Sequence, residues 1–374
     1  MAVDAKAKAL RAKGERVIGF GIGEPDFDTP AHIKEAAKRA LDGRIGFYTP
    51  VAGTMELREA AAAAFRADGV PAEAARVLIS CGAKHALYNA LMVLVDDADE
   101  VVIPAPFWVS YPAMVEAAGG VPVYVDTSAD RFILTPEKLL GALTPRTKVV
   151  VLNSPGNPSG ATHSREQFAA LGEALAGHPG VTVLSDEIYQ HLVYEGAAFI
   201  SFAAACPALA ARTVTVNGVS KSYAMTGWRI GYATGAKDVV DAMIRFQSHA
   251  TSNPTAIAQA AALAALTGPR ESVETMRATF DRRRRLMTSL LADIPGLALH
   301  RPDGAFYCFP DVRALLGPRT GRTALEFATQ LLERERVACV PGEAFGGPGF
   351  LRLSYACGDA DIEEGCARMK KYVG

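Results

Sequence analysis

Short apolar runs rich in valine and isoleucine recur along much of the chain, and helix-like segments separate several of them. The runs are RVIGFGIG, RVLISCG, EVVIPAP, VPVYVD, KVVVLNSP, VTVLSDE, TVTVNG and RIGYATG, and they are typical of buried β-strands. Segments such as HALYNALMVLV, SYPAMVEAAGG and SREQFAALGEALAGH indicate helices, the last with Ser164 as a candidate N-cap. This alternation predicts an α/β fold with a mostly parallel sheet that helices cover on both faces.

The pattern changes near Ser272, where SVETMRATFDRRRRLMTSLLADIPG predicts one long helix that Pro295 and Gly296 end. Its arginines, Arg282 to Arg285, form either a basic binding patch or a solvated helix face. In so neutral a chain we expect the solvated face. The segments that follow indicate strand, helix, strand, helix, and so predict a smaller α/β domain.

Charge and composition limit the kinds of partner. The 374 residues include 39 basic and 40 acidic side chains, which leaves no broad field to attract nucleic acid or an acidic membrane. The cysteines are scattered without metal spacing, and no apolar run approaches the about 20 residues that a membrane span needs. We expect a cytoplasmic protein with a small-molecule partner, no metal, no nucleic acid and no membrane.

Ligand sites in open α/β sheets lie at the carboxyl ends of the strands. One such place is NGVSKSYAMTGWRIGY, where Lys221 and Arg229 stand among small and apolar residues. Either the ammonium of a lysine there is paired, or its pKa is lowered, as an imine-forming lysine requires. The third possibility is that the side chain snorkels, with its ammonium in solvent. Arg229 offers a planar grip for a phosphate or a carboxylate.

Three other strand ends carry side chains with two explanations each. The turn in LISCGAKHAL aims the N–H groups of Gly82, Ala83 and Lys84 at an anion, or its glycine only closes the turn. Trp108 stacks on a flat ring, or it is an ordinary half-buried aromatic. Asn157 in NSPGNPSG binds a ligand oxygen, or it serves a tight turn that contains a cis Asn-Pro bond.

Two charged residues sit in apolar strands. In VLSDEIYQHLVY a buried strand ends at Asp186, with Tyr189 one helical turn further on; Asp186 either requires a cationic partner or caps a helix. Arg352 in GFLRLSYAC either faces inward toward an anion or lies on an edge strand. Taken together, the strand ends supply a phosphate cup, a stacking ring, an acid, an imine lysine and a carboxylate clamp, which are the needs of pyridoxal 5'-phosphate.

These motifs carry a family resemblance. GVSKSYAMTGWRIG fits, position by position, the cofactor-lysine signature of fold-type I, class I aminotransferases, and GIGEPDFDTP with MTGWRIGY resembles the bacterial aspartate aminotransferase branch. The resemblance implies a large three-layer αβα domain over 36–274. It also implies a smaller α/β domain made of 1–35 and 275–374.

The resemblance implies a catalytic role for Lys221, Asp186 and Tyr189. Lys221 would form the imine with pyridoxal 5'-phosphate and act as general base, while Asp186 would pair with the pyridine nitrogen. Asn157 and Tyr189 would hydrogen-bond the ring's phenolic oxygen, and Trp108 would stack over the ring. Trp108 and Asn157 would also border the substrate.

The resemblance further implies the phosphate and substrate ligands. The phosphate ligands would be Arg229, Ser220 and the N–H groups of Ala83 and Lys84. Tyr48 would reach the partner's phosphate, which requires a homodimer with shared active sites. Arg352 and Gly23 would hold the substrate α-carboxylate. Lys84 would bind a distal carboxylate, with Ser252 and Asn253 as helpers from the partner chain.

The expected activity is an aminotransferase of amino acid metabolism that moves the amino group of aspartate or glutamate to a 2-oxo acid in a ping-pong cycle. A glutamate/aspartate-prephenate or aromatic amino acid aminotransferase is the alternative. A non-catalytic regulator that binds pyridoxal phosphate is a further alternative. The complete set of Lys221, Asp186 and Arg352 favours turnover.

Overall fold

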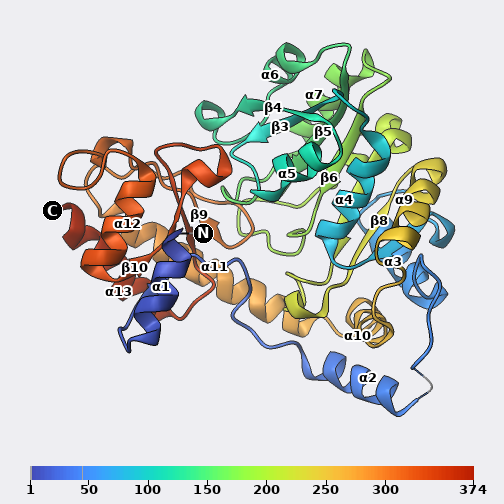
Figure 1. Cartoon of the computed structure of the whole chain (residues 1–374), viewed down its shortest axis with the longest axis horizontal. Helices are drawn as coiled ribbons and strands as arrows, with labels where there is room; N and C mark the ends of the chain where they lie inside the picture. Colours follow the sequence, from blue (N-terminus) through green and yellow to red (C-terminus); the bar gives the residue numbers. More distant parts are fainter. Residues whose placement is uncertain (1, 44) are drawn as a thin grey trace.

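The computed structural model describes residues 2–43 and 45–374, and two groups of elements are visible in Figure 1. The larger group surrounds a seven-stranded sheet of order β2-β8-β7-β6-β5-β3-β4. β4, β3, β5, β6 and β7 are parallel, whereas β8 pairs antiparallel with both β7 and β2. The predicted mostly parallel α/β sheet is therefore confirmed.

The strands of this sheet coincide with the apolar runs. They are β2 (Val77–Ser80), β3 (Glu100–Ala105), β4 (Val121–Asp126), β5 (Thr147–Asn153), β6 (Thr182–Asp186), β7 (Thr213–Gly218) and β8 (Gly231–Thr234). Asn153 of β5 is in register with Asp186 of β6, and Asp186 with Val216 of β7. The carboxyl ends of these central strands therefore lie at one edge.

Alternate residues of the central strands enter different cores, as the two-residue period of a strand requires. In β5, Val149 and Val151 pack in one cluster with α4 (Ala83–Leu94), α5 (Ser110–Ala117) and α9 (Lys237–Ala250). Val150 and Leu152 pack in another cluster with α6 (Pro136–Ala142) and α7 (Arg165–Ala176). Both faces of these strands are thus apolar, which explains the continuous valine and isoleucine runs.

Helices of the larger group cover both faces of the sheet, although the first of them packs mainly against the last (Figure 1). They are α2 (Ala31–Asp42), α3 (Met55–Ala67), α4 (Ala83–Leu94), α5 (Ser110–Ala117), α6 (Pro136–Ala142), α7 (Arg165–Ala176), α8 (Phe202–Ala205), α9 (Lys237–Ala250) and α10 (Ala256–Thr267). The predicted cap of α7 is confirmed, because Ser164 and Gln167 form a reciprocal capping box.

The smaller group combines the two ends of the chain. It contains α1 (Ala2–Ala12), β1 (Ile18–Gly19), β9 (Tyr307–Cys308), α12 (Ala324–Glu335), β10 (Val337–Ala338), β11 (Val340–Pro341), β12 (Leu351–Ser354) and α13 (Asp359–Val373). β1 pairs with β10, and β12 lies between β11 and β9. We propose on this basis that 1–35 and 275–374 form one domain, with boundaries that fall inside α2 and α11.

The long helix α11 (Glu271–Ala292) runs between the two groups, as Figure 1 shows. It corrects the prediction that Arg282 to Arg285 form a solvated face. Arg283 is 9% and Arg284 1% exposed, and only Arg282 and Arg285 reach the surface. Arg284 pairs with Asp281 one turn earlier, which allows its charge to be buried.

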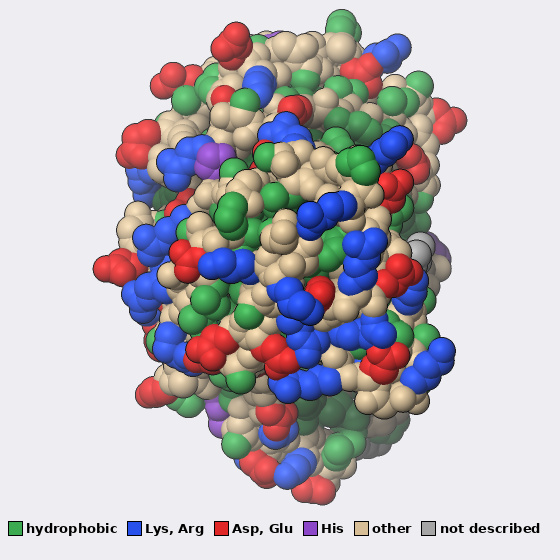
Figure 2. Space-filling model, turned by 90° about the vertical axis from the view of Figure 1, so that its left-hand side faces the viewer, with side chains coloured by type: hydrophobic (Ala, Val, Ile, Leu, Met, Phe, Trp, Pro, Cys, Tyr) green, Lys and Arg blue, Asp and Glu red, His purple; other side chains and the backbone are tan. Residues whose placement is uncertain are grey.

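The outer face of the smaller group carries charges of both signs. Figure 2 shows lysine and arginine interspersed with aspartate and glutamate there. Lys6 pairs with Glu333, and Lys371 pairs with Glu335. In residues 2–43 and 45–374, no helix combines the length and the apolar character needed to cross a membrane.

Candidate active site

A cavity of about 470 Å³ opens at the carboxyl ends of β5, β6 and β7, next to the smaller group. This volume is within the usual range for small-ligand pockets. The structure brings these predicted residues to its wall: Gly23, Ala83, Lys84, Trp108, Asn157, Asp186, Tyr189, Ser220, Lys221, Arg229 and Arg352. Residues that are distant in the sequence therefore meet in one pocket.

Lys221 follows β7, and its ammonium faces the cavity. Its Nζ donates to the Gly23 carbonyl at 2.6 Å and lies 5.9 Å from the centre of the Tyr189 ring. These contacts exclude the snorkelling alternative. Burial, with the nearby positive charges of Arg352 and Arg229, lowers the pKa of Lys221 to about 8, against the opposite effect of Glu24 and Asp186. The amine is therefore neutral at a pH where an ordinary lysine is still charged.

Asp186 is the last residue of β6 and is 4% exposed. Turns follow it rather than a helix, so the helix-cap explanation is wrong, and so is the expected helical turn to Tyr189. Its carboxylate accepts a hydrogen bond from the Tyr111 hydroxyl at 2.6 Å and one from the Ile188 N–H at 3.3 Å. Burial raises the pKa of Asp186 to about 6, although these bonds and the charge of Lys221 favour its ionised form. Such a buried acid gains most from a cation beside it.

The turn before α4 forms a cup that only small residues fit. Gly82 has φ +89°, and a Cβ there would lie 2.4 Å from the Arg229 Nη2. A Cβ on Gly231 would lie 2.2 Å from the Ala83 nitrogen. The first N–H groups of a helix have no partner inside it, and those of α4 begin at Ala83, at the cavity wall. A helix N-terminus with an arginine beside it is a site for an anion.

Arg229 is positioned by backbone carbonyls rather than by an acid. It has φ +57°, donates to the carbonyl of Thr226 at 2.9 Å, and donates to that of Cys81 at 3.3 Å. Among the described residues, its guanidinium donates to these two carbonyls and to no carboxylate. Its charge is thus available to an anion in the cup.

Arg352 lies on β12, the middle strand of its sheet, which excludes the edge-strand alternative. It is 8% exposed, and it donates to Asn157 Oδ1 at 3.2 Å and to the Gly21 carbonyl at 2.8 Å. Its Nε is buried without a hydrogen-bond partner among the described residues. A buried guanidinium with an unsatisfied N–H is suited to a carboxylate ligand.

Lys84 and Trp108 lie together at the wall of the cavity. The Lys84 Nζ is 4.9 Å from the centre of the Trp108 ring, and the ring meets Tyr111 edge-on at 5.4 Å. Trp108 is therefore partly open to the pocket, unlike a core aromatic. Lys84 adds to the cavity a cation that is separate from Arg352.

Two functional candidates were missed in the sequence. Tyr111 bonds Asp186, and Tyr307 lines the cavity with its hydroxyl 3.0 Å from that of Tyr189. Tyr111 stands three residues after Trp108, in the first turn of α5, so its place just after Trp108 was a usable signal. Tyr307 lies in the aromatic run AFYCF, which gives no signal that distinguishes a core residue from a site residue.

Some predicted residues lie outside the cavity. Tyr48 is 91% exposed, and Ser252 and Asn253 do not line the pocket. All of them were expected to act on a partner subunit, so their roles stay predictions. The segment around Tyr48 packs beside the start of α10, because Gln259 donates to Thr49 at 2.9 Å.

The residues present fit pyridoxal 5'-phosphate. The glycine cup and Arg229 suit a phosphate, and the buried Asp186 suits a pyridinium nitrogen. Lys221 offers an amine of lowered pKa inside the same cavity. Each of these features is costly to the protein alone and is explained by one ligand.

Comparison with known proteins agrees with this geometry. Residues 15–369 match the family "Aminotransferase class I and II", and the chain belongs to this family of pyridoxal-phosphate-dependent transaminases. It is 49% identical over 375 residues to an aspartate aminotransferase of Geobacillus stearothermophilus, covering 100% of this chain and 95% of that protein. It is 48% identical over 379 residues to an aspartate/prephenate aminotransferase of Cereibacter sphaeroides, with 100% and 95% covered. The crystal structure of the aspartate aminotransferase from Rhizobium meliloti superposes with a TM-score of 0.96 at 44% identity, covering 100% of this chain and 95% of that one.

Proposed function

We propose that this enzyme transfers the amino group of aspartate or glutamate to a 2-oxo acid such as 2-oxoglutarate, with pyridoxal 5'-phosphate held at Lys221. The observation that carries the proposal is the presence of Arg352 and Lys84 in the same cavity as Lys221. Two cations on one wall can each hold one carboxylate of a dicarboxylic substrate. The names of the relatives from Geobacillus stearothermophilus and Rhizobium meliloti support the same substrate class.

The cofactor would be held by residues of this chain at both ends. The phosphate would be bound by Arg229, Ser220 and the N–H groups of Ala83 and Lys84, and the pyridine nitrogen by Asp186. Asn157 and Tyr189 would bind the phenolic oxygen, and Trp108 would cover the ring. When bound, the cofactor supplies an aldehyde that condenses with amines and a ring that withdraws electrons from the substrate Cα.

Lys221 would move the proton in this reaction. Its amine is neutral above a pH of about 8, and a neutral amine can accept the proton of the substrate Cα. The carbonyl of Gly23 fixes the Nζ at 2.6 Å and therefore sets its starting position. The same nitrogen can then return the proton, so one residue serves as base and as acid.

Arg352 and Gly23 would orient the substrate by its α-carboxylate. Asn157 and the Gly21 carbonyl already hold two N–H groups of Arg352, which fixes the guanidinium before the substrate arrives. Such prior positioning lowers the entropic cost of binding. Lys84 would then select substrates with a second carboxylate.

We infer that the enzyme acts as a homodimer with shared active sites. The exposed side chains Phe47, at 63%, and Tyr48, at 91%, are unusual for aromatic residues and suit contact with a second copy. In such a dimer Tyr48 would reach the partner's phosphate, and Ser252 and Asn253 would approach the partner's substrate. A location in the cytoplasm stays a prediction.

A substrate panel on the purified holoenzyme tests the proposed activity. Aspartate, glutamate, phenylalanine, tyrosine and alanine would each be offered with 2-oxoglutarate or oxaloacetate, and glutamate also with prephenate. We expect the highest kcat/KM for the aspartate and 2-oxoglutarate pair. Faster turnover of prephenate or of an aromatic pair would replace the aspartate proposal with that alternative.

The role of Lys84 has its own test. Lys84→Gln should lower kcat/KM for aspartate by about ten-fold or more, the effect of one charge-assisted bond, and leave that for alanine nearly unchanged. Lys237→Gln is the matched control, because Lys237 is an exposed lysine of α9 paired with Asp241. An equal loss for aspartate and alanine would show that Lys84 does not select the distal carboxylate.

A further inference from the structure

The hydroxyl groups of Tyr189 and Tyr307 form a buried pair at the wall of the cavity. Their oxygens are 3.0 Å apart, and either one can be the donor. Tyr189 is 3% and Tyr307 1% exposed, so solvent does not compete for this bond. A phenol has one proton to donate. If Tyr189 donates to Tyr307, it cannot donate to another group at the same time.

Tyr307 also contacts the groups proposed to hold the substrate carboxylate. The guanidinium carbon of Arg352 lies 4.6 Å from the centre of the Tyr307 ring. On the other side, a Cβ placed on Gly23 would lie 3.4 Å from the Tyr307 hydroxyl. Tyr307 thus connects the carboxylate clamp to Tyr189.

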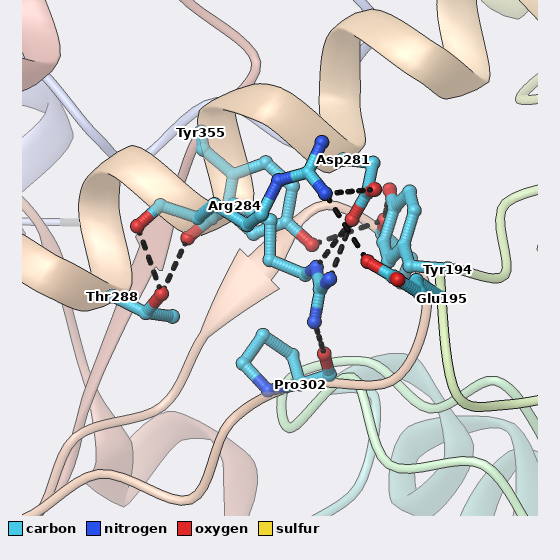
Figure 3. Close-up of polar contacts among 9 residues, drawn as sticks. Tyr194, Glu195, Asp281, Arg284, Thr288, Pro302 and Tyr355 are labelled. Carbon is cyan, nitrogen blue, oxygen red and sulfur yellow. Dashed lines mark hydrogen bonds and ion pairs between the residues drawn. The ribbon is translucent and has the colours of Figure 1, made fainter.

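Buried side chains hold the backbone a few residues before Tyr307, and Figure 3 shows Arg284 among them, bonded to Pro302. The buried Arg284 donates to the Pro302 carbonyl at 3.1 Å. The hydroxyls of Tyr194 and Tyr355 both donate to the Ala305 carbonyl, that of Tyr355 at 3.3 Å. These bonds hold the backbone just before Tyr307, and its own ring is buried, so its hydroxyl proton is the part most free to reorient.

We propose that Tyr307 is a positioning residue that couples carboxylate binding at Arg352 to the hydrogen bond between Tyr189 and the cofactor. This inference rests on the cofactor and carboxylate positions of the proposed function. A cation over a phenol ring withdraws electron density and makes the hydroxyl a better donor. With Arg352 unpaired, Tyr307 donates to Tyr189, whose own proton is then available to the cofactor's phenolic oxygen.

Binding of a carboxylate reverses this preference. The carboxylate offsets the charge of Arg352, so Tyr307 becomes a weaker donor and a better acceptor. Tyr189 then turns its proton to Tyr307, and the phenolic oxygen loses a donor. An oxygen that loses a hydrogen-bond donor holds a proton more tightly, so the cofactor should titrate at higher pH once the carboxylate is bound.

Other charged or titratable groups also face this pair. They are Arg352, Glu24, Asp186, Lys221 and Tyr111. Their contributions remain when the Tyr307 hydroxyl is removed. A variant that lacks only this oxygen therefore isolates its effect.

The test is a pH titration of the absorbance of the bound cofactor in the holoenzyme, with and without maleate, a dicarboxylate that has no amino group. In the wild-type enzyme, maleate should raise the titration midpoint. In Tyr307→Phe the rise should be smaller by about one pH unit, the scale of one hydrogen bond. Tyr372→Phe is the matched control and should keep the full rise, because its buried hydroxyl donates to the Thr320 carbonyl, away from the pair of Tyr189 and Tyr307.

An unchanged rise in Tyr307→Phe would overturn the proposal. Tyr189→Phe should show the same reduced rise, and the double variant should show no further loss. A full rise in Tyr189→Phe would also overturn the proposal, even if Tyr307→Phe did not fold. Failure of the proposed substrate class gives a different result from failure of the coupling. If the substrate class were wrong, the titration midpoint of the wild-type enzyme would respond to 3-phenylpropionate but not to maleate. The variants would then be compared with 3-phenylpropionate. No response to either ligand would overturn the coupling.

Discussion

The hydrogen bond from Tyr111 to Asp186 should control cofactor binding through the protonation of Asp186. Asp186 is buried, its pKa is raised to about 6, and the Tyr111 hydroxyl at 2.6 Å is its shortest hydrogen bond. Among the described residues, Tyr111→Phe would leave the Asp186 carboxylate only the Ile188 N–H, at 3.3 Å. A hydrogen bond to a charged group contributes about 1.5–3 kcal/mol, so the pKa of Asp186 should rise by a further one to two units, roughly.

The sign of the effect follows from the form that binds. The ionised carboxylate pairs with the pyridine nitrogen, so cofactor affinity falls as the pH drops through the pKa of Asp186 in the cofactor-free enzyme. In Tyr111→Phe this fall should begin at higher pH. Affinity should be about ten-fold weaker than in the wild type near pH 6, and the two should converge above about pH 8, where both carboxylates are ionised.

The assay is a titration of the cofactor-free enzyme with pyridoxal 5'-phosphate, followed by quenching of tryptophan fluorescence across this pH range. Tyr372→Phe is the control, because its buried hydroxyl binds the Thr320 carbonyl in the smaller group, away from the cavity. Identical curves of cofactor affinity against pH for Tyr111→Phe and the wild type would refute the reasoning. So would a loss of affinity that is the same at every pH.

Other parts of the site give further predictions. Arg352→Lys should raise the KM for the amino acid by about ten- to a hundred-fold, because lysine cannot form a bidentate pair with a carboxylate. Cofactor affinity should stay unchanged. Steady-state kinetics would measure the KM, and an equal weakening of cofactor binding would contradict the assignment. Gly82→Ala should cost about 1–3 kcal/mol of unfolding free energy, because Gly82 has φ +89° and ψ 160°, a conformation that essentially only glycine adopts. It should also weaken cofactor binding, because the new Cβ would lie 2.4 Å from the Arg229 Nη2. Unchanged stability in a denaturation series or unchanged cofactor affinity would argue against the cup. The rate of cofactor capture by the cofactor-free enzyme should increase with pH and level off above about pH 8, as Lys221 becomes neutral. This rate would be measured by stopped-flow absorbance. A rate that rises steadily toward pH 10 would contradict the lowered pKa of Lys221.

Local patterns were sufficient for most of the fold. The valine and isoleucine runs placed β2 to β8. Except for the partly exposed edge strand β4, these strands are buried on both faces, which leaves a continuous apolar signal. Ser164 was correctly identified as a cap, since capping depends on residues only three positions apart. Most of the predicted site residues line the cavity, because each stands at a strand end or in a signature that resembles a known family.

Contacts between distant segments could not be predicted in the same way. Arg283 and Arg284 were expected on a solvated face, but Asp26, Asp281 and the Pro302 carbonyl satisfy them in the interior. Helix periodicity does not show whether a distant acid or carbonyl will meet an arginine. Tyr307 was missed for the same reason, since its partners Tyr189 and Arg352 lie on other elements.

The most direct test of the central claim is to locate the bound cofactor. The holoenzyme would be treated with borohydride, which reduces an imine to a stable amine, and then digested for peptide mass analysis. The added mass of the reduced cofactor should be on Lys221, and Lys221→Ala should carry no label and show no transamination. A label on Lys84 or another lysine, or wild-type transamination by Lys221→Ala, would contradict the account.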